Sequence, residues 1–182
     1  MKKLLSVICS LALCFSIVAP AAAIEAPSEQ LQIDVSNSCI SLKNVEAYES
    51  LSDTELRSIV SQFNLPESEI DELFAAKNSI ENSSSPMRVK FPSNPDIGDT
   101  YTDTIHISIE AVQSSAEAFQ ALVNAGVSIP VATVVAAGLF AYANANADSG
   151  STGVDVTIEY YYGPDNDGEV RWNYRRVWFS MV

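Results

Sequence analysis

Histidine is nearly absent from this sequence, which contains only His106. A metal site built from several histidines is therefore excluded. Ser-His-Asp catalysis would have to use this one imidazole, and no G-x-S-x-G turn is present to supply its serine. A pair of Cys39 with His106 has no supporting local pattern. We therefore predict no catalytic residue, no metal ligand and no cofactor, and we expect a protein that is not an enzyme.

Basic residues are also few, with 10 lysines and arginines against 23 aspartates and glutamates. The formal net charge is −13, and it becomes −15 once the two lysines at positions 2 and 3 are removed with a leader peptide. A charge of this size favours solubility and repels nucleic acid and anionic lipid at long range. The composition therefore excludes a nucleic-acid partner and argues against electrostatic attraction of the whole chain to membranes.

The chain begins with a pattern typical of a secretory signal peptide. Two lysines precede a fifteen-residue apolar stretch over residues 4–18, which is shorter than the roughly 20 residues needed to span a bilayer. The small residues Ala21 and Ala23 fit a signal peptidase, so cleavage is predicted before Ile24. We therefore expect residues 1–23 to be removed and the protein to be secreted.

Cysteine is scarce as well, because two of the three cysteines lie inside the predicted signal peptide. Cys39 then remains alone, so no disulfide can form within one mature chain. The fold must be held together by packing. The sequence leaves open whether Cys39 pairs between chains, and it does not indicate an oligomeric state.

Charge and composition divide the mature chain into three parts. Residues 24–85 carry 12 acids against three basic residues and are predicted to form an acidic helical segment. Residues 86–97, rich in proline and serine, are expected to be a linker. Residues 98–182 are predicted to be an α+β domain.

Two short amphipathic helices are expected in the acidic segment. The first begins at a capping box, Ser52 to Glu55, and the second at Pro66, a residue favoured in the first helical turn. Helices this short need something to pack against. They are either a peripheral helical pair or a pro-segment that covers the following domain until it is removed.

The last part of the chain has the order β-α-α-β-β. Alternating and helical patterns predict three strands and an αα-hairpin, over residues 101–109, 110–125, 130–146, 154–162 and 169–181. An antiparallel sheet with the αα-hairpin on one face would bury these apolar stripes economically. The fold class is therefore α+β.

The final strands are rich in aromatic residues interleaved with arginines. Strand alternation predicts that Trp172, Tyr174, Arg176 and Trp178 share one face. Exposed tryptophan and tyrosine beside arginine suit a sugar-stacking platform, a protein interface or the headgroup level of a membrane. The alternative is a small aromatic core with cross-strand pairs. The predicted binding surface comprises Tyr160, Tyr162, Trp172, Tyr174, Arg176 and Trp178.

The predicted helical hairpin over residues 110–146 is unusually apolar. No charged residue occurs from Val127 to Ala147, and the central run 130–142 is too short to cross a bilayer by itself. A buried core helix is the default interpretation. The alternative is a hairpin that leaves the core and enters a target membrane.

This layout, the strand entry Gly98-Asp-Thr-Tyr-Thr102 and the tyrosine-rich hairpin ending in Trp178 resemble the geobacillin-like large secreted bacteriocins of Gram-positive bacteria, over roughly residues 98–182. The resemblance implies a secreted, non-enzymatic antibacterial protein that acts on the cell envelope of a competitor. Its partner would be a glycan, a surface protein or the membrane of the target cell, with membrane contact through residues 110–146. The alternative is an extracellular binding module for cell-wall glycan or a surface protein, which uses the aromatic strands.

Overall fold

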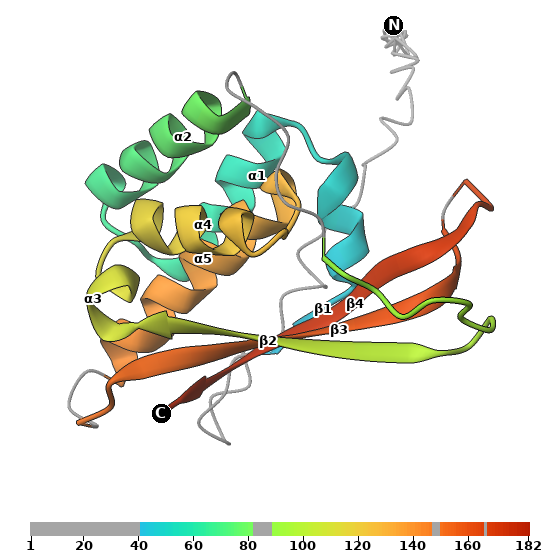
Figure 1. Cartoon of the computed structure of the whole chain (residues 1–182). Helices are drawn as coiled ribbons and strands as arrows, with labels where there is room; N and C mark the ends of the chain where they lie inside the picture. Colours follow the sequence, from blue (N-terminus) through green and yellow to red (C-terminus); the bar gives the residue numbers. More distant parts are fainter. Residues whose placement is uncertain (1–40, 82–88, 147–149, 166) are drawn as a thin grey trace, which may run out of the picture.

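The computed structural model describes residues 41–81, 89–146, 150–165 and 167–182. The predicted signal peptide, with Ala21, Ala23 and Ile24, lies outside these residues. Figure 1 shows an antiparallel sheet whose helices all lie on one face, so the predicted α+β class is confirmed.

The sheet has the strand order β1-β4-β3-β2, and every neighbouring pair is antiparallel. The three long strands agree closely with the predicted ones: β2 (Thr100–Ser108), β3 (Gly153–Pro164) and β4 (Val170–Met181). The short edge strand β1 (Ser41–Lys43) was not predicted, because three residues are too few to show an alternating pattern. The acidic segment therefore contributes a strand to the sheet.

A β-bulge interrupts the pairing of β3 with β4. Glu159 faces Arg176, but the next residue, Tyr160, faces Tyr174, so Arg175 is an extra residue in β4. One extra residue reverses the inward and outward alternation for the rest of a strand. Even-numbered residues of β4 before the bulge therefore lie on one face of the sheet, and even-numbered residues after the bulge lie on the other face.

The prediction that Trp172, Tyr174, Arg176 and Trp178 share one face is consequently wrong. Trp172 and Tyr174 pair with Tyr162 and the buried Tyr160, on the face that carries the helices. Arg176 and Trp178 lie beyond the bulge and belong to the opposite face, where Trp178 faces Thr157. Strand alternation failed here because a bulge is a property of the pairing and not of one strand.

The helical layer follows the predicted signals. The Ser52 capping box is present, with its hydroxyl accepting from the Glu55 N–H and the Glu55 carboxylate accepting from the Ser52 N–H, and Pro66 precedes the second helix. The predicted hairpin is broken once, between α3 and α4. The helices are η3 (Val45–Ser50), α1 (Asp53–Val60), η4 (Ser61–Phe63), α2 (Glu67–Glu81), α3 (Ile109–Val112), α4 (Ser115–Asn124) and α5 (Ile129–Ala145).

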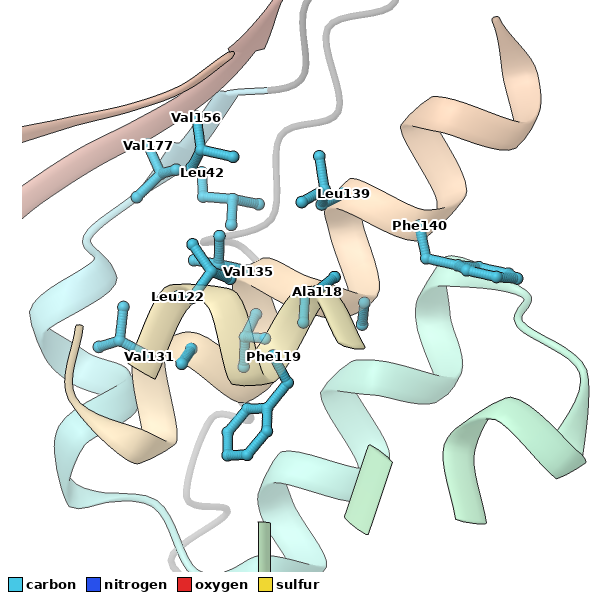
Figure 2. Packing of buried hydrophobic residues seen from close by; sticks show 14 of the residues in the cluster. Leu42, Ala118, Phe119, Leu122, Val131, Val135, Leu139, Phe140, Val156 and Val177 are labelled. Carbon is cyan, nitrogen blue, oxygen red and sulfur yellow. The ribbon is translucent and has the colours of Figure 1, made fainter. Parts of the chain in front are cut away.

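Helix α5 is the centre of the hydrophobic core. Residues 131–140 are all buried, and Figure 2 shows Val135 and Leu139 between the sheet residue Val177 and helix α4. The default interpretation, a buried core helix, therefore describes this conformation. Among the described residues, no helix combines the length and apolarity needed to cross a membrane. Entry of the hairpin into a target membrane stays a prediction.

The acidic segment, as far as it is described, shares this core. Buried residues of α1 and α2 belong to the same apolar cluster as α4, α5 and the sheet. Lys77, buried in α2, joins the two acidic helices through contacts of 2.7 Å with both Asp53 and Glu81. The linker at 86–97 therefore does not separate two hydrophobic cores, and residues 41–81 are part of the fold. Whether the segment is removed stays an open prediction.

Candidate functional site

The tip of the β3–β4 hairpin extends past the helical layer (Figure 1). Four of its aromatic residues, Tyr160, Tyr162, Trp172 and Tyr174, lie on the same face of the sheet as the helices. The ring centroids of Tyr160 and Tyr174 are 5.0 Å apart, and those of Tyr162 and Trp172 are 5.3 Å apart. Both are cross-strand pairs that stabilise the hairpin. The bulge at Arg175 is what brings these four rings together on one face.

Phe91 covers this group of rings from the segment that leads into β2. Its ring stacks on Trp172 with a centroid distance of 5.3 Å and an interplanar angle of 12°. It also makes T-shaped contacts with Tyr160 and Tyr101, at ring-centroid distances of 4.9 Å and 5.8 Å. The segment predicted to be only a linker therefore packs on the sheet.

A hollow of about 450 Å³ lies beside these rings, and we call it the aromatic groove. The four hairpin aromatics and Phe91 line it, together with Val89, the turn at Gly126, and Val170 and Arg171 at the rim. A cavity of this size falls within the range of ordinary ligand pockets. Its walls are largely apolar, so it suits an apolar or aromatic group of a partner.

The aromatic groove is anchored to the helical core through Tyr174. The Tyr174 hydroxyl accepts a hydrogen bond of 2.8 Å from the Ser128 N–H, directly before α5. Burial raises the pKa of Tyr174, and burial, aided by Tyr174 and Asp103, raises the pKa of Tyr160. Both phenols are therefore neutral at physiological pH, and the groove floor carries no charge.

The arginines of β4 are paired with carboxylates. Arg171 contacts the nearly buried carboxylate of Asp165 at 2.8 Å. Arg175 contacts Glu159 at 3.0 Å, and Arg176 lies 3.9 Å from the same carboxylate. Glu159 thus faces two arginines, and the partly exposed guanidinium groups retain capacity for a further anionic neighbour.

A larger and more polar hollow of about 820 Å³, which we call the polar hollow, lies beside the same hairpin and shares Tyr174 with the aromatic groove. Asn44, Glu46 and Ala47 line one side, and Asn173 and Arg175 line the other. The Asn173 amide is fixed by donating to the main-chain oxygens of Gly163 and Arg171, at 3.0 and 3.1 Å.

The six predicted binding residues are therefore divided between the two faces. Tyr160, Tyr162, Trp172 and Tyr174 line the aromatic groove, whereas Arg176 and Trp178 do not. Five lining residues were missed: Val89, Phe91, Gly126, Val170 and Arg171. The alternation of Val89-Lys90-Phe91 is the signal that predicts an apolar pair on one side of an extended segment.

His106 lies on the helix-free face of the sheet, far along β2 from the groove. Its Nδ1 is 2.9 Å from Asp155 Oδ1, and the neighbouring hydroxyls of Thr104 and Thr157 share a hydrogen bond of 3.3 Å. Within the part of the chain that the structure describes, no group of three or more His, Cys, Asp or Glu side chains is placed to hold a metal ion.

Comparison with protein-family models, with curated proteins and with solved structures gives no significant match for this chain.

Proposed function

We propose that this protein is a secreted binding module that recognises a protein partner outside the cell through the aromatic groove. The observation that carries the proposal is the hollow of about 450 Å³ beside the hairpin, with aromatic walls, an uncharged floor and Arg171 at its rim. Protein interfaces are enriched in tyrosine, tryptophan and arginine, and their energetically dominant residues are often aromatic side chains in such hollows.

A protein partner fits the groove better than a glycan does. Sugar hydroxyls need hydrogen-bonding partners, and leaving them unpaired is costly. The Tyr174 hydroxyl already accepts from Ser128, and Arg171 is paired with Asp165. Sugar stacking also needs an open ring face, and Phe91 already stacks on Trp172. Apolar side chains of a protein make no such demands.

The resemblance to secreted bacteriocins suggests a biological role for this module, which is to act against competing bacteria. In that role the partner is a surface protein of a competing bacterium, and the aromatic groove is the targeting surface. Helix α5 is a poor candidate for the effector in the folded state, because membrane entry would require its buried residues 131–140 to leave the core. The free energy lost on exposing these residues to water would exceed the net stability of most small domains.

The two tryptophans provide a matched test, since both lie on β4 and are partly exposed but face opposite sides of the sheet. Labelled protein beginning at Ile24 is added to a panel of Gram-positive cells, with and without prior protease treatment of the cell surface. We expect binding that protease treatment removes. Trp172→Ala should weaken it about tenfold or more, as for a dominant interface residue, and Trp178→Ala should leave it within about twofold.

Equal affinities of the Trp172→Ala and wild-type proteins would contradict the groove, and binding that survives protease but not glycan removal would favour a glycan. A killing assay on the same cells tests the antibacterial role. In that assay Trp172→Ala should lose killing together with binding, whereas release of dye from protein-free liposomes should not occur.

A further inference from the structure

The outer edge of β4 is covered over only part of its length. Strand β1 pairs with Arg176 to Trp178 and ends at Lys43. Asn44 then adopts a left-handed conformation, with φ 53°, and turns the chain into η3. Among the described residues, no strand pairs with the outer edge of β4 from Val170 to Arg175. Among the described residues, this strand position beside β4 is therefore vacant, although η3 packs on β4 and reaches the space beside Tyr174 and Arg175.

The main chain of this edge has hydrogen-bonding groups that point into the vacant position. The N–H of Tyr162 donates to Asp99, and its carbonyl accepts from Gly98, so both groups point toward β2. In an antiparallel pair, residues whose groups point away from the partner strand face residues that do the same. Trp172 is paired with Tyr162 and therefore directs its N–H and C=O away from β3. Tyr174, two residues further along, does so as well.

The two hollows lie beside the same edge. Trp172 lines the aromatic groove, Asn173 and Arg175 line the polar hollow, and Tyr174 borders both. Side chains of a strand alternate between its two faces, so residues of an added strand that lie opposite Trp172 and Tyr174 would enter the aromatic groove. The residue between them would lie beside Asn173, on the side of the polar hollow.

Charge favours an acid at that middle position. The side chains of Arg171 and Arg175 are each about half exposed. Arg175 lines the polar hollow, and Arg171 lies at the rim of the aromatic groove, two residues from Asn173 in sequence. Glu46 is the acid that lines the polar hollow. In a chain with a net charge of −13, this is a place where an acidic side chain gains contacts with arginine instead of meeting further carboxylates.

We propose that the partner of this protein contributes an extended peptide segment that adds as a strand to β4 beside Trp172 and Tyr174. The segment has the pattern apolar-acidic-apolar, with its apolar side chains in the aromatic groove and its acid beside Arg171 and Arg175. The assignment rests on the proposed function, and it specifies the partner as a peptide strand recognised mainly through its backbone. Strand addition to an open sheet edge is a recurring mode of peptide recognition.

The test uses a display library of linear twelve-residue random peptides, panned on the chain beginning at Ile24. We expect enriched peptides with alternating apolar and acidic residues. N-methylation of a synthetic binder should weaken binding more than tenfold at alternate amides and less than twofold at the intervening ones. Amide hydrogen exchange should slow at Trp172 and Tyr174 when the peptide binds. Arg175→Glu should weaken binding, and Arg176→Glu, beyond the vacant edge, serves as the matched control.

No enrichment, or binders that tolerate N-methylation at every position, would overturn strand addition. The proposed function of the aromatic groove would still hold after such a result if Trp172→Ala weakens binding to cells. Conversely, peptides could bind by strand addition while Trp172→Ala leaves binding to cells unchanged. That combination would support strand addition to β4 and reject the proposed function. The two proposals can therefore fail separately.

Discussion

Ser115, at the start of α4, is joined to Glu69 of α2 by contacts that span 46 positions of the sequence. The Ser115 N–H donates to the Glu69 carboxylate at 3.0 Å, and the Ser115 hydroxyl lies 2.8 Å from the Glu69 carbonyl and 2.9 Å from the carboxylate. The acid of one helix thus satisfies an N–H in the first turn of another, where a negative charge is also favourable. This contact ties the acidic segment to the C-terminal part of the chain.

Replacing Ser115 or Glu69 by alanine should destabilise the fold. Ser115 is fully buried, so loss of its partner leaves a buried polar group unpaired, at a cost of about 1–3 kcal/mol. The measurement is the free energy of unfolding in urea. The double variant should lose less than the sum of the two single losses, because both remove one interaction. Glu72→Ala, an exposed acid on the same helix, should change stability by less than about 0.5 kcal/mol.

The fragment 86–182 should not fold by itself. It lacks β1, η3, α1 and α2, and their buried residues Leu42, Tyr48, Leu56 and Leu73 cover the core around α5. Circular dichroism and the dispersion of amide proton signals in NMR check this expectation. A protease site placed within 82–88 offers the matched control, since cutting there should leave two pieces that co-elute on gel filtration. A folded, monomeric 86–182 fragment would instead support a removable pro-segment.

Alkaline unfolding should depend on Tyr48. Burial raises the pKa of this phenol to about 12 from an ordinary value of 10.0. Since the folded-state pKa is the higher one, the stabilisation is complete below pH 10 and is lost as the pH rises toward 12. Tyr48→Phe should abolish this loss of stability, which is about 3 kcal/mol when complete, for two pKa units at 1.36 kcal/mol each. Unfolding free energies measured at intervals between pH 8 and pH 12 test the difference.

At neutral pH the same variant should be neutral or slightly stabilising, because the Tyr48 hydroxyl has no hydrogen-bond partner among the described residues. Tyr161→Phe, at a half-buried position of β3, is the matched control for the loss of a tyrosine hydroxyl. Parallel pH profiles of Tyr48→Phe and wild type would contradict the prediction.

Gly138→Ala should destabilise the protein although alanine is the better helix former. A Cβ atom at this position of α5 would lie 3.1 Å from Phe63 Cε1 and 3.3 Å from Phe179 Cε2. Overpacking of a core costs about 1–3 kcal/mol, against a gain of about 1 kcal/mol in helix propensity. We expect a net loss of about 1 kcal/mol by thermal or urea unfolding. Adding Phe63→Leu should restore part of the loss, and a gain in stability from Gly138→Ala alone would disprove the tight contact.

Local signals in the sequence predicted most of the elements. The capping box at Ser52, the proline at position 66 and the glycine at position 126 each act over one helical turn, so neighbouring residues suffice to read them. The β3 alternation is equally local. These patterns were confirmed because they depend on backbone conformation and apolar periodicity, which a single segment contains.

The candidate site could be predicted only in part. Its four hairpin aromatics were identified from composition, but their shared face was not, since the bulge at Arg175 arises from the pairing of β4 with β3. Phe91 was assigned to a linker, because nothing local shows that it would stack on Trp172, which lies far along the sequence. The charge balance around Arg175 likewise required knowing that Glu159 lies across the sheet.

The sequence by itself determined the α+β class, the helix starts and stops, and the apolar character that buries α5. Only the tertiary structure decided which face each aromatic ring occupies, which carboxylate neutralises each arginine, and that the acidic helices belong to the common core. The physical reason is the distance along the sequence over which each kind of interaction acts. Helix caps and periodicity act between neighbours in the chain, whereas strand register, bulges and ion pairs depend on residues that meet only after folding.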